Sequence, residues 1–196
     1  MVISEKDAKQ AIKEIVADSI SVKQKLIEQQ SGIILDISKA IADTFSKGGT
    51  VYLFGNGGSA ADAQHVAAEF VGRFARERRA LPAEALTTNT SILTAIGNDY
   101  DFSEVFSRQV KAKVHPIDIV VGISTSGKSK NVINGLRSAK EIGAKTIGFT
   151  GAEPALMGEF SDICLCVPSK STPRIQESHI MVWHMVSEIV ERSIFE

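Results

Sequence analysis

The feature that most constrains the fold is an alternation of short apolar runs with helical patterns after residue 48. Five runs have strand length and are rich in apolar or β-branched residues: TVYLF (50–54), AEAL (83–86), IDIVVGI (117–123), KTIGFT (145–150) and ICLCV (163–167). Helical patterns follow these runs at about 59–73, 101–113, 129–142, 153–160 and 173–195. Alternation of this kind builds right-handed βαβ units, and hence a parallel sheet with helices on both faces. The sequence therefore predicts an α/β protein with a five-stranded parallel sheet.

The segment before residue 48 has a helical pattern. Apolar side chains recur in it at helical spacing, at Ile12, Ile15, Val16 and Ile20 among others. Ser31-Gly32 predicts a break between two helices, and Gly48-Gly49 predicts the end of the second. These helices exceed what the sheet needs as cover, so we expect them to pack against another subunit. We therefore divide the chain into an N-terminal helical arm for oligomerisation, 1–48, and an α/β domain, 49–196, within one structural domain.

Composition excludes several classes of partner. A net charge of −1 over 196 residues provides no electrostatic attraction for nucleic acid or an anionic membrane surface. No apolar run approaches the ~20 residues needed to cross a bilayer, and the start MVISEKDAKQ is too charged for a signal peptide. We therefore expect a cytoplasmic protein with no nucleic-acid and no membrane partner.

Two small clusters have plain structural interpretations. Four arginines lack aromatic partners and predict a solvated surface or a subunit contact: Arg73, Arg76, Arg78 and Arg79. The two cysteines, Cys164 and Cys166, are too few for a disulfide framework and share one face of a predicted strand. We expect them to be small buried residues; a metal or redox pair is the alternative.

A glycine-rich loop, GNGGSA, follows the first predicted strand and opens a helix. Gly55, Gly57 and Ala60 satisfy the relaxed dinucleotide pattern G-x-G-x-x-G/A. A dinucleotide site is nevertheless excluded, because the next strand ends in LTT (86–88) where an acidic residue would hold the ribose. The loop keeps glycines that expose backbone N–H groups and a helix N-terminus that favours negative or strongly polar groups.

A second loop, STSGKS (124–129), follows the third predicted strand. It offers four hydroxyls, those of Ser124, Thr125, Ser126 and Ser129. Together with backbone N–H groups around Gly127 they form a plausible cradle for a phosphate. The alternative is a turn in which Ser129 caps the helix, but a turn needs only one or two such residues. Both loops follow strands of a parallel sheet, so we expect them at its carboxyl edge, where ligands bind.

Four polar side chains on two predicted helices are candidates for chemistry. His65 and Glu69 share one helix face among small apolar neighbours, although a surface hydrogen bond is the simpler interpretation. Gln176 and His184 lie eight residues apart, about 80° of rotation, so both can face one cleft. The four groups suit a weakly held borderline metal. They equally suit metal-free acid–base work by a carboxylate and a histidine.

Four segments resemble the phosphoheptose isomerases, a family of the sugar isomerase (SIS) domain group: GNGGSAADAQH…E, LTTNTSILTAIGNDYDF, GISTSGKS and TPRIQESH…H. The resemblance spans about residues 50–192 in the family's order. It implies a single SIS domain, a flavodoxin-like three-layer sandwich, in a homotetramer with active sites at subunit interfaces. It also implies interconversion of sedoheptulose 7-phosphate and D-glycero-D-manno-heptose 7-phosphate, the first step towards ADP-heptose and the heptose of lipopolysaccharide core.

The resemblance also assigns roles to residues. The implied substrate contacts are Asn56, Gly57, Gly58, Glu69, Asn98, Asp99, Ser124, Thr125, Ser126, Ser129 and Gln176. The implied ligands of one Zn²⁺ per subunit are His65, Glu69, Gln176 and His184, with Glu69 and His184 as the catalytic acid–base pair. The implied reaction passes through a cis-enediol. Thr172-Pro173 and Asn89 depart from the family pattern, and they bear on substrate contacts and the subunit interface.

Three other functions stay open. A non-catalytic SIS-domain adaptor that tetramerises and binds the replication initiator protein shares most of the loop pattern, but it need not keep His184. A regulatory sensor would bind sedoheptulose 7-phosphate without turnover. A related aldose–ketose isomerase would act on another sugar phosphate. The complete set of four polar side chains favours the phosphoheptose isomerase.

Overall fold

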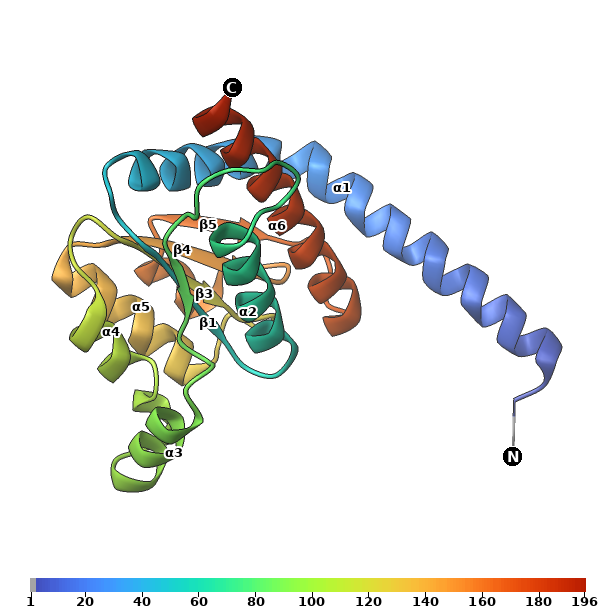
Figure 1. Ribbon diagram of the computed structural model, residues 1–196. Coiled ribbons are helices and arrows are strands. Elements are labelled where there is room, and N and C mark those ends of the chain that lie inside the picture. The colour runs from blue at the N-terminus through green and yellow to red at the C-terminus, as the bar shows by residue number, and fades with distance from the viewer. Residues whose placement is uncertain (1–2) are drawn as a thin grey trace.

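Five parallel strands form the sheet at the centre of the molecule (Figure 1). The computed structural model describes residues 3–196. The strands are β1 (Val51–Gly55), β2 (Ala83–Ala85), β3 (Ile119–Ile123), β4 (Lys145–Thr150) and β5 (Ile163–Cys166). Their order in the sheet is β2-β1-β3-β4-β5, and every neighbouring pair is parallel. This is the flavodoxin-like order, whose switch point lies between β1 and β3. The predicted fold class is confirmed.

Helices cover both faces of this sheet (Figure 1). They are α1 (Glu5–Ser46), α2 (Gly58–Val71), α3 (Thr90–Asp99), α4 (Ser107–Lys113), α5 (Lys130–Ile142) and α6 (Thr172–Phe195), with 3₁₀ turns η1 (Phe102–Glu104) and η2 (Ala155–Phe160). Alternate residues of each strand point to opposite faces. Leu53 therefore packs in the cluster under α1, α2 and α6, whereas Phe54 packs in the cluster under α4 and α5. Two cores on one sheet make a three-layer sandwich.

The helix α1 runs unbroken through Ser31 and Gly32, so the predicted division into two helices is wrong. The Ser31 hydroxyl donates to the Ile27 carbonyl within the same helix. A Cβ at Gly32 would meet nothing within 4 Å, so the glycine faces open space. Glycine inside a helix costs about 1 kcal/mol, less than the burial of one large aliphatic side chain gains. The next turns bury three such residues against the core, Ile34, Ile37 and Ile41.

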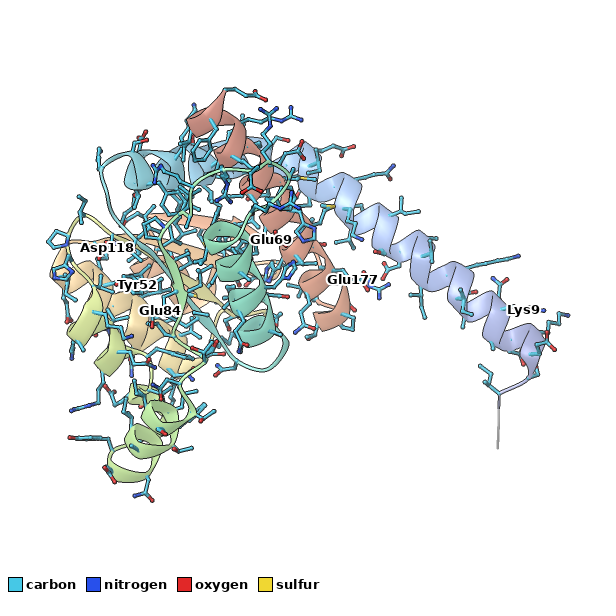
Figure 2. The ribbon with its side chains drawn as sticks, viewed as in Figure 1. Lys9, Tyr52, Glu69, Glu84, Asp118 and Glu177 are labelled. Atoms are coloured by element: carbon cyan, nitrogen blue, oxygen red, sulfur yellow. The ribbon has the colours of Figure 1, made fainter. Side chains whose placement is uncertain are left out.

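The first half of α1 extends away from the sandwich (Figure 1). Two polar contacts near its middle tie it to α6: Ser19 Oγ donates to Glu177 Oε2 at 2.8 Å, and Arg174 donates to the Ile15 carbonyl at 2.7 Å. Figure 2 shows Glu177 on α6, between that helix and α1. Four apolar side chains of this half are each more than 50% exposed: Ile12, Ile15, Val16 and Ile20. We call these four residues the α1 stripe.

The helix α3 was not among the predicted helices, and the predicted helix 101–113 is split into η1 and α4. Asn89 starts α3, because its side chain accepts a hydrogen bond from Ile92 N at 3.0 Å. The asparagine that departs from the family pattern thus serves as an N-cap. No residue of α3 is buried, and the helix projects from the sandwich (Figure 1).

The two cysteines of β5 are half-buried rather than buried, so this expectation is met only in part. The hydrogen bond with Cys166, together with burial, raises the pKa of Cys164. Both thiols are free. Among the helices of residues 3–196, none combines the length and apolarity needed to cross a bilayer.

His179 of α6 lies fully buried. Its Nε2 is 3.0 Å from the Thr150 carbonyl. Its ring forms a T-shaped contact with the Phe149 ring at a centroid distance of 5.6 Å. Burial lowers the pKa of His179 from 6.5 to about 4, against the opposing effect of the Thr150 carbonyl. The imidazole is therefore neutral in the folded protein at neutral pH.

Acidification should destabilise the fold through His179. Between pH 6.5 and 4 the unfolded chain binds a proton at this residue that the native state does not, so stability falls as the pH falls. The loss should reach about 3 kcal/mol by pH 4. Urea unfolding at pH 7, 5.5 and 4 measures it against His179→Gln, in which this contribution disappears. Equal pH slopes for the two proteins would contradict the assignment.

Candidate functional site

The two glycine- and serine-rich loops leave the sheet side by side. Gly55, the last residue of β1, pairs with Ile123, the last residue of β3. The loop 56–58 and the loop 124–129 therefore both start at the switch point, on the carboxyl edge of the sheet. This is where the sequence placed a ligand site.

The first loop is held in shape by an amide pair. Asn56 and Asn131 exchange two hydrogen bonds of 2.9 Å, each donating Nδ2 to the other's Oδ1. Asn131 lies on α5 and is only 4% exposed. Asn131 could not be identified from the sequence, because its partner lies 75 positions away and no local pattern marks it. Asn131 therefore fixes the orientation of the loop residue expected to contact substrate.

The backbone requires glycine at one position of this loop, and a second glycine lies against a neighbouring helix. Gly57 has a φ of +54°, which disfavours other residues. Gly58 begins α2, and a Cβ there would lie 2.4 Å from Nε2 of Gln176. Gln176 on α6 thus packs directly on the N-terminal turn of α2.

The hydroxyls of the second loop converge. Ser124 Oγ lies 2.9 Å from Ser129 Oγ and 3.4 Å from Ser126 Oγ. Ser129 occupies the N-cap position of α5 but makes no side-chain capping bond. Its hydroxyl turns to Ser124 instead, which disfavours the alternative of a simple capped turn.

A cavity of about 380 Å³ adjoins this loop. Its lining includes hydroxyl and basic side chains, namely those of Thr125, Ser126, Lys128, Lys170 and Thr172. Hydroxyls and two ammonium groups attract a phosphate, and they outnumber the one carboxylate of the lining, that of Glu153.

His65, Glu69 and His184 form one cluster between α2 and α6. His65 Nε2 lies 3.1 Å from His184 Nε2 and 3.3 Å from Glu69 Oε1. Figure 2 shows Glu69 on α2, near α6. The side chain of Glu69 is 22% exposed and that of His65 is 47% exposed, so solvent and ligands reach both. The predicted grouping of these three residues is observed.

This cluster could hold a metal ion. One ligand atom from each residue lies within 4.8 Å of the other two. Ligand atoms of a tetrahedral zinc site lie roughly 3.3 Å apart, given bonds of about 2.0 Å. The two shorter separations, 3.1 and 3.3 Å, match that spacing. Two imidazoles and a carboxylate fit the donor set of a borderline divalent metal.

The chain by itself does not gather every residue predicted for the site. The Gln176 amide lies against Gly58, seven residues before His65 along α2 and so about 10 Å from it along the axis. Asn98 donates to Asp99 at 2.9 Å, and both lie exposed at the end of α3. Gln176 as a metal ligand, and Asn98 and Asp99 as substrate contacts, stay predictions.

One of the four clustered arginines contradicts the prediction of a solvated surface or a subunit contact. The side chain of Arg78 is 2% exposed and pairs with Glu191 of α6. Arg73 and Arg76 are exposed and make ion pairs with Glu77 and Glu196. A run of basic residues alone does not show which of its members finds a buried carboxylate.

Comparison with known proteins places the chain in a family. The SIS domain family model matches residues 15–151. A phosphoheptose isomerase of Roseiflexus sp. (strain RS-1) is 58% identical over 178 residues, which cover 91% of this chain and 90% of that protein. The chain belongs to the phosphoheptose isomerase family.

Solved structures of this family share the whole fold. The phosphoheptose isomerase of Neisseria gonorrhoeae superposes with a TM-score of 0.90 at 39% identity, over 94% of this chain and 99% of that one. The phosphoheptose isomerase from Francisella tularensis gives 0.91 at 34% identity, over 94% and 98%. The resemblance inferred from the four motifs is confirmed, and with it the enzyme class, an aldose–ketose isomerase.

Proposed function

We propose that this protein interconverts sedoheptulose 7-phosphate and D-glycero-D-manno-heptose 7-phosphate. The observation that carries the proposal is the convergence of His65, Glu69 and His184 on one point between α2 and α6. The hydroxyl loop 124–129 starts at the carboxyl edge of the sheet, beside the loop that leads into α2. A seven-carbon sugar phosphate has its carbonyl and its phosphate at opposite ends. It can therefore engage an acid–base cluster and a phosphate cradle together.

In this proposal Glu69 moves the proton between C1 and C2, and His184 serves the two oxygens as acid and base. A zinc ion held by His65, Glu69, His184 and Gln176 would supply Lewis-acid polarisation of these oxygens. His65 lies next to both other groups, 3.1 Å from His184 and 3.3 Å from Glu69. Ser124, Thr125, Ser126 and Ser129 bind the phosphate, whose binding energy fixes the register of the carbon chain. Asn56, Gly57 and Gly58 contact the sugar hydroxyls.

The proposal includes a homotetramer with active sites at subunit interfaces. The apolar α1 stripe is exposed in this chain, and no residue of α3 is buried. Both surfaces are available to a neighbouring copy. Asn98, Asp99 and Gln176 lie outside the cluster in one chain, so a neighbouring copy is expected to complete the site. The assembled enzyme acts in the cytoplasm, in the first step towards ADP-heptose and the heptose of lipopolysaccharide core.

An NMR time course in D₂O tests the reaction. Purified protein is incubated with sedoheptulose 7-phosphate, with added zinc or with a chelator. An aldoheptose phosphate carrying deuterium at C2 supports the enediol route. Loss of turnover with chelator supports a metal in the cluster. A folded protein that shows neither turnover nor deuterium exchange would overturn the proposal and favour the adaptor.

Removing one hydroxyl of the loop 124–129, which we call the phosphate loop, should weaken substrate binding. Ser126→Ala is expected to raise KM about tenfold or more, because a hydrogen bond to a charged group contributes roughly 1.5–3 kcal/mol, and to change kcat little. Steady-state kinetics measures both constants. Ser193→Ala, which removes an exposed hydroxyl bonded only to the Ile189 carbonyl of its own helix, is the matched control. An unchanged KM would place the phosphate at another loop.

A further inference from the structure

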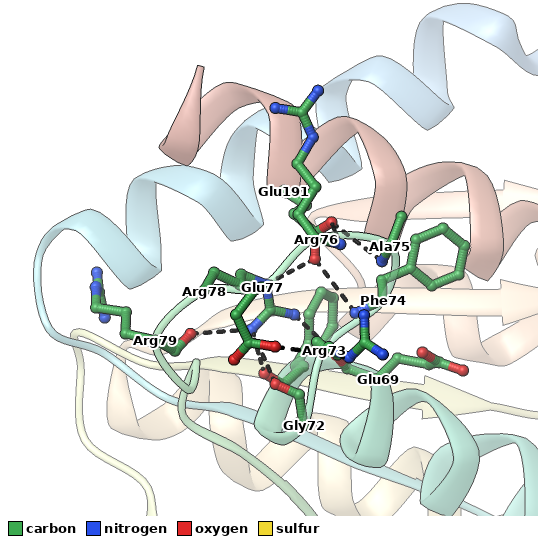
Figure 3. A network of polar contacts seen from close by, with 11 residues as sticks. Glu69, Gly72, Arg73, Phe74, Ala75, Arg76, Glu77, Arg78, Arg79 and Glu191 are labelled. Atoms are coloured by element: carbon green, nitrogen blue, oxygen red, sulfur yellow. Dashed lines mark hydrogen bonds and ion pairs between the residues drawn. The ribbon is translucent and has the colours of Figure 1, made fainter.

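A buried arginine holds the C-terminal end of α2, next to the three residues His65, Glu69 and His184, which we call the reactive cluster. Arg78 donates to the Glu69 carbonyl at 2.8 Å and to the Phe70 carbonyl at 2.9 Å (Figure 3). The last carbonyls of a helix lack intrahelical partners and favour a cation. No basic residue lies in the last turn of α2 itself, so Arg78 supplies that cation from the following loop. The backbone of Glu69, whose carboxylate belongs to the reactive cluster, is thereby fixed.

The partner of this arginine is Glu191 on α6. Both side chains are 2% exposed, and Arg78 Nε lies 2.7 Å from Glu191 Oε2. The Glu191 carboxylate also accepts three backbone N–H bonds, of 2.7 to 3.2 Å, from Phe74, Ala75 and Arg76 (Figure 3). Burial opposes the charged form, but these four donors hold the pKa of Glu191 below its usual value. Glu191 is thus a charged anchor for the loop after α2.

The same anchor reaches the second helix of the reactive cluster. Glu191 follows His184 by seven residues, about two turns, so both side chains lie on one side of α6. Phe74, whose N–H bonds to Glu191, places its ring against the His184 imidazole at a centroid distance of 5.8 Å. One ion pair therefore connects to Glu69 through its backbone carbonyl and to His184 through the Phe74 ring.

We propose that Arg78 and Glu191 are positioning residues that set the distance between Glu69 and His184. Neither side chain reaches the substrate, since both are almost fully buried. Their effect is on geometry: the pair fixes the last turn of α2, which carries Glu69, against α6 about two turns beyond His184. The inference rests on the proposed function of that cluster. Displacement of a reacting group by about 1 Å can lower a rate by about 10²-fold, so a structural pair at this place controls catalysis.

Glu191→Gln is the first test, because it keeps the shape of the side chain and removes its charge. Thermal unfolding and circular dichroism establish that the variant is folded. We expect kcat to fall about 10- to 100-fold, with KM within about threefold, because the phosphate loop is untouched. Zinc affinity, measured by chelator competition without substrate, should fall about tenfold or more, as for other residues that orient metal ligands. Glu196→Gln, which removes an exposed carboxylate paired with Arg76 on the same loop, should change neither quantity.

Arg78→Lys is the second test. It tests the proposal in the case that Glu191→Gln does not fold. Lysine keeps the charge facing Glu191 but cannot also reach the carbonyls of Glu69 and Phe70. A kcat lowered about tenfold at unchanged KM supports positioning; a folded variant with kcat within twofold of the wild type overturns it. If the wild type binds zinc but does not turn over sugar phosphate, the proposed function fails instead. Zinc affinity of the two variants then tests the positioning role alone.

Discussion

Replacing Glu69 with glutamine is expected to lower kcat for sedoheptulose 7-phosphate by about 10²- to 10⁴-fold. Glutamine has the size of glutamate but cannot accept a proton, so the transfer between C1 and C2 loses its base. Substrate affinity should stay within about tenfold, because in the proposed binding mode the phosphate is held by loop 124–129, which the substitution leaves intact. Single-turnover kinetics measures the chemical step, and calorimetric titration measures the affinity.

The matched control is Glu77→Gln, the same substitution at a carboxylate that is 92% exposed and lies after α2. It should leave kcat unchanged. Undiminished turnover in Glu69→Gln would assign the base to another residue. A parallel fall in kcat and in affinity would instead indicate that Glu69 acts mainly as a metal ligand.

Placing charge on the α1 stripe should dissociate the enzyme. Val16 and Ile20 are each 51% exposed in the isolated chain. The double variant Val16→Glu/Ile20→Glu should therefore fold normally as a monomer. In an assembly that covers the stripe, each buried unpaired carboxylate costs several kcal/mol. Analytical ultracentrifugation should show loss of the proposed tetramer at micromolar concentration, and activity should fall with it because the proposed sites lie between subunits.

The control adds negative charge to the opposite side of α1, with Gln10→Glu and Lys25→Glu. These positions lie about 160° and 220° around the helix from Ile12, on the basis of 100° per residue. They should leave both the assembly and the activity intact. A tetramer that survives Val16→Glu/Ile20→Glu would show that the stripe is not the interface.

The sheet could be predicted from the sequence because its signals are local. Each strand is a short apolar run, and alternation with helices determines that neighbouring strands are parallel. The positions of the two loops could be predicted in the same way, because each loop follows the last residue of a strand, at the carboxyl edge of the sheet. His65 and Glu69 could be paired because residues four apart share a helix face.

What the sequence did not predict depends on contacts between distant residues. The continuity of α1 through Gly32 comes from burial of the following turns against the core, which overrides the local glycine signal. The buried pair Arg78–Glu191 and the amide pair Asn56–Asn131 join residues 113 and 75 positions apart. The helix α3 had a local signal, Asn89 before an apolar run, which could have identified its start.

The pairing of α1 with α6 bears on how the chain folds during synthesis. The contacts Ser19–Glu177 and Ile15–Arg174 join residues 158 and 159 positions apart. At 5–20 residues per second a ribosome needs roughly 10 to 30 s to make that intervening chain. During this time α1 lacks α6, and the core that buries Ile34, Ile37 and Ile41 in the folded protein is incomplete. Nascent chains of this protein are therefore expected to bind a chaperone at α1 until α6 has emerged.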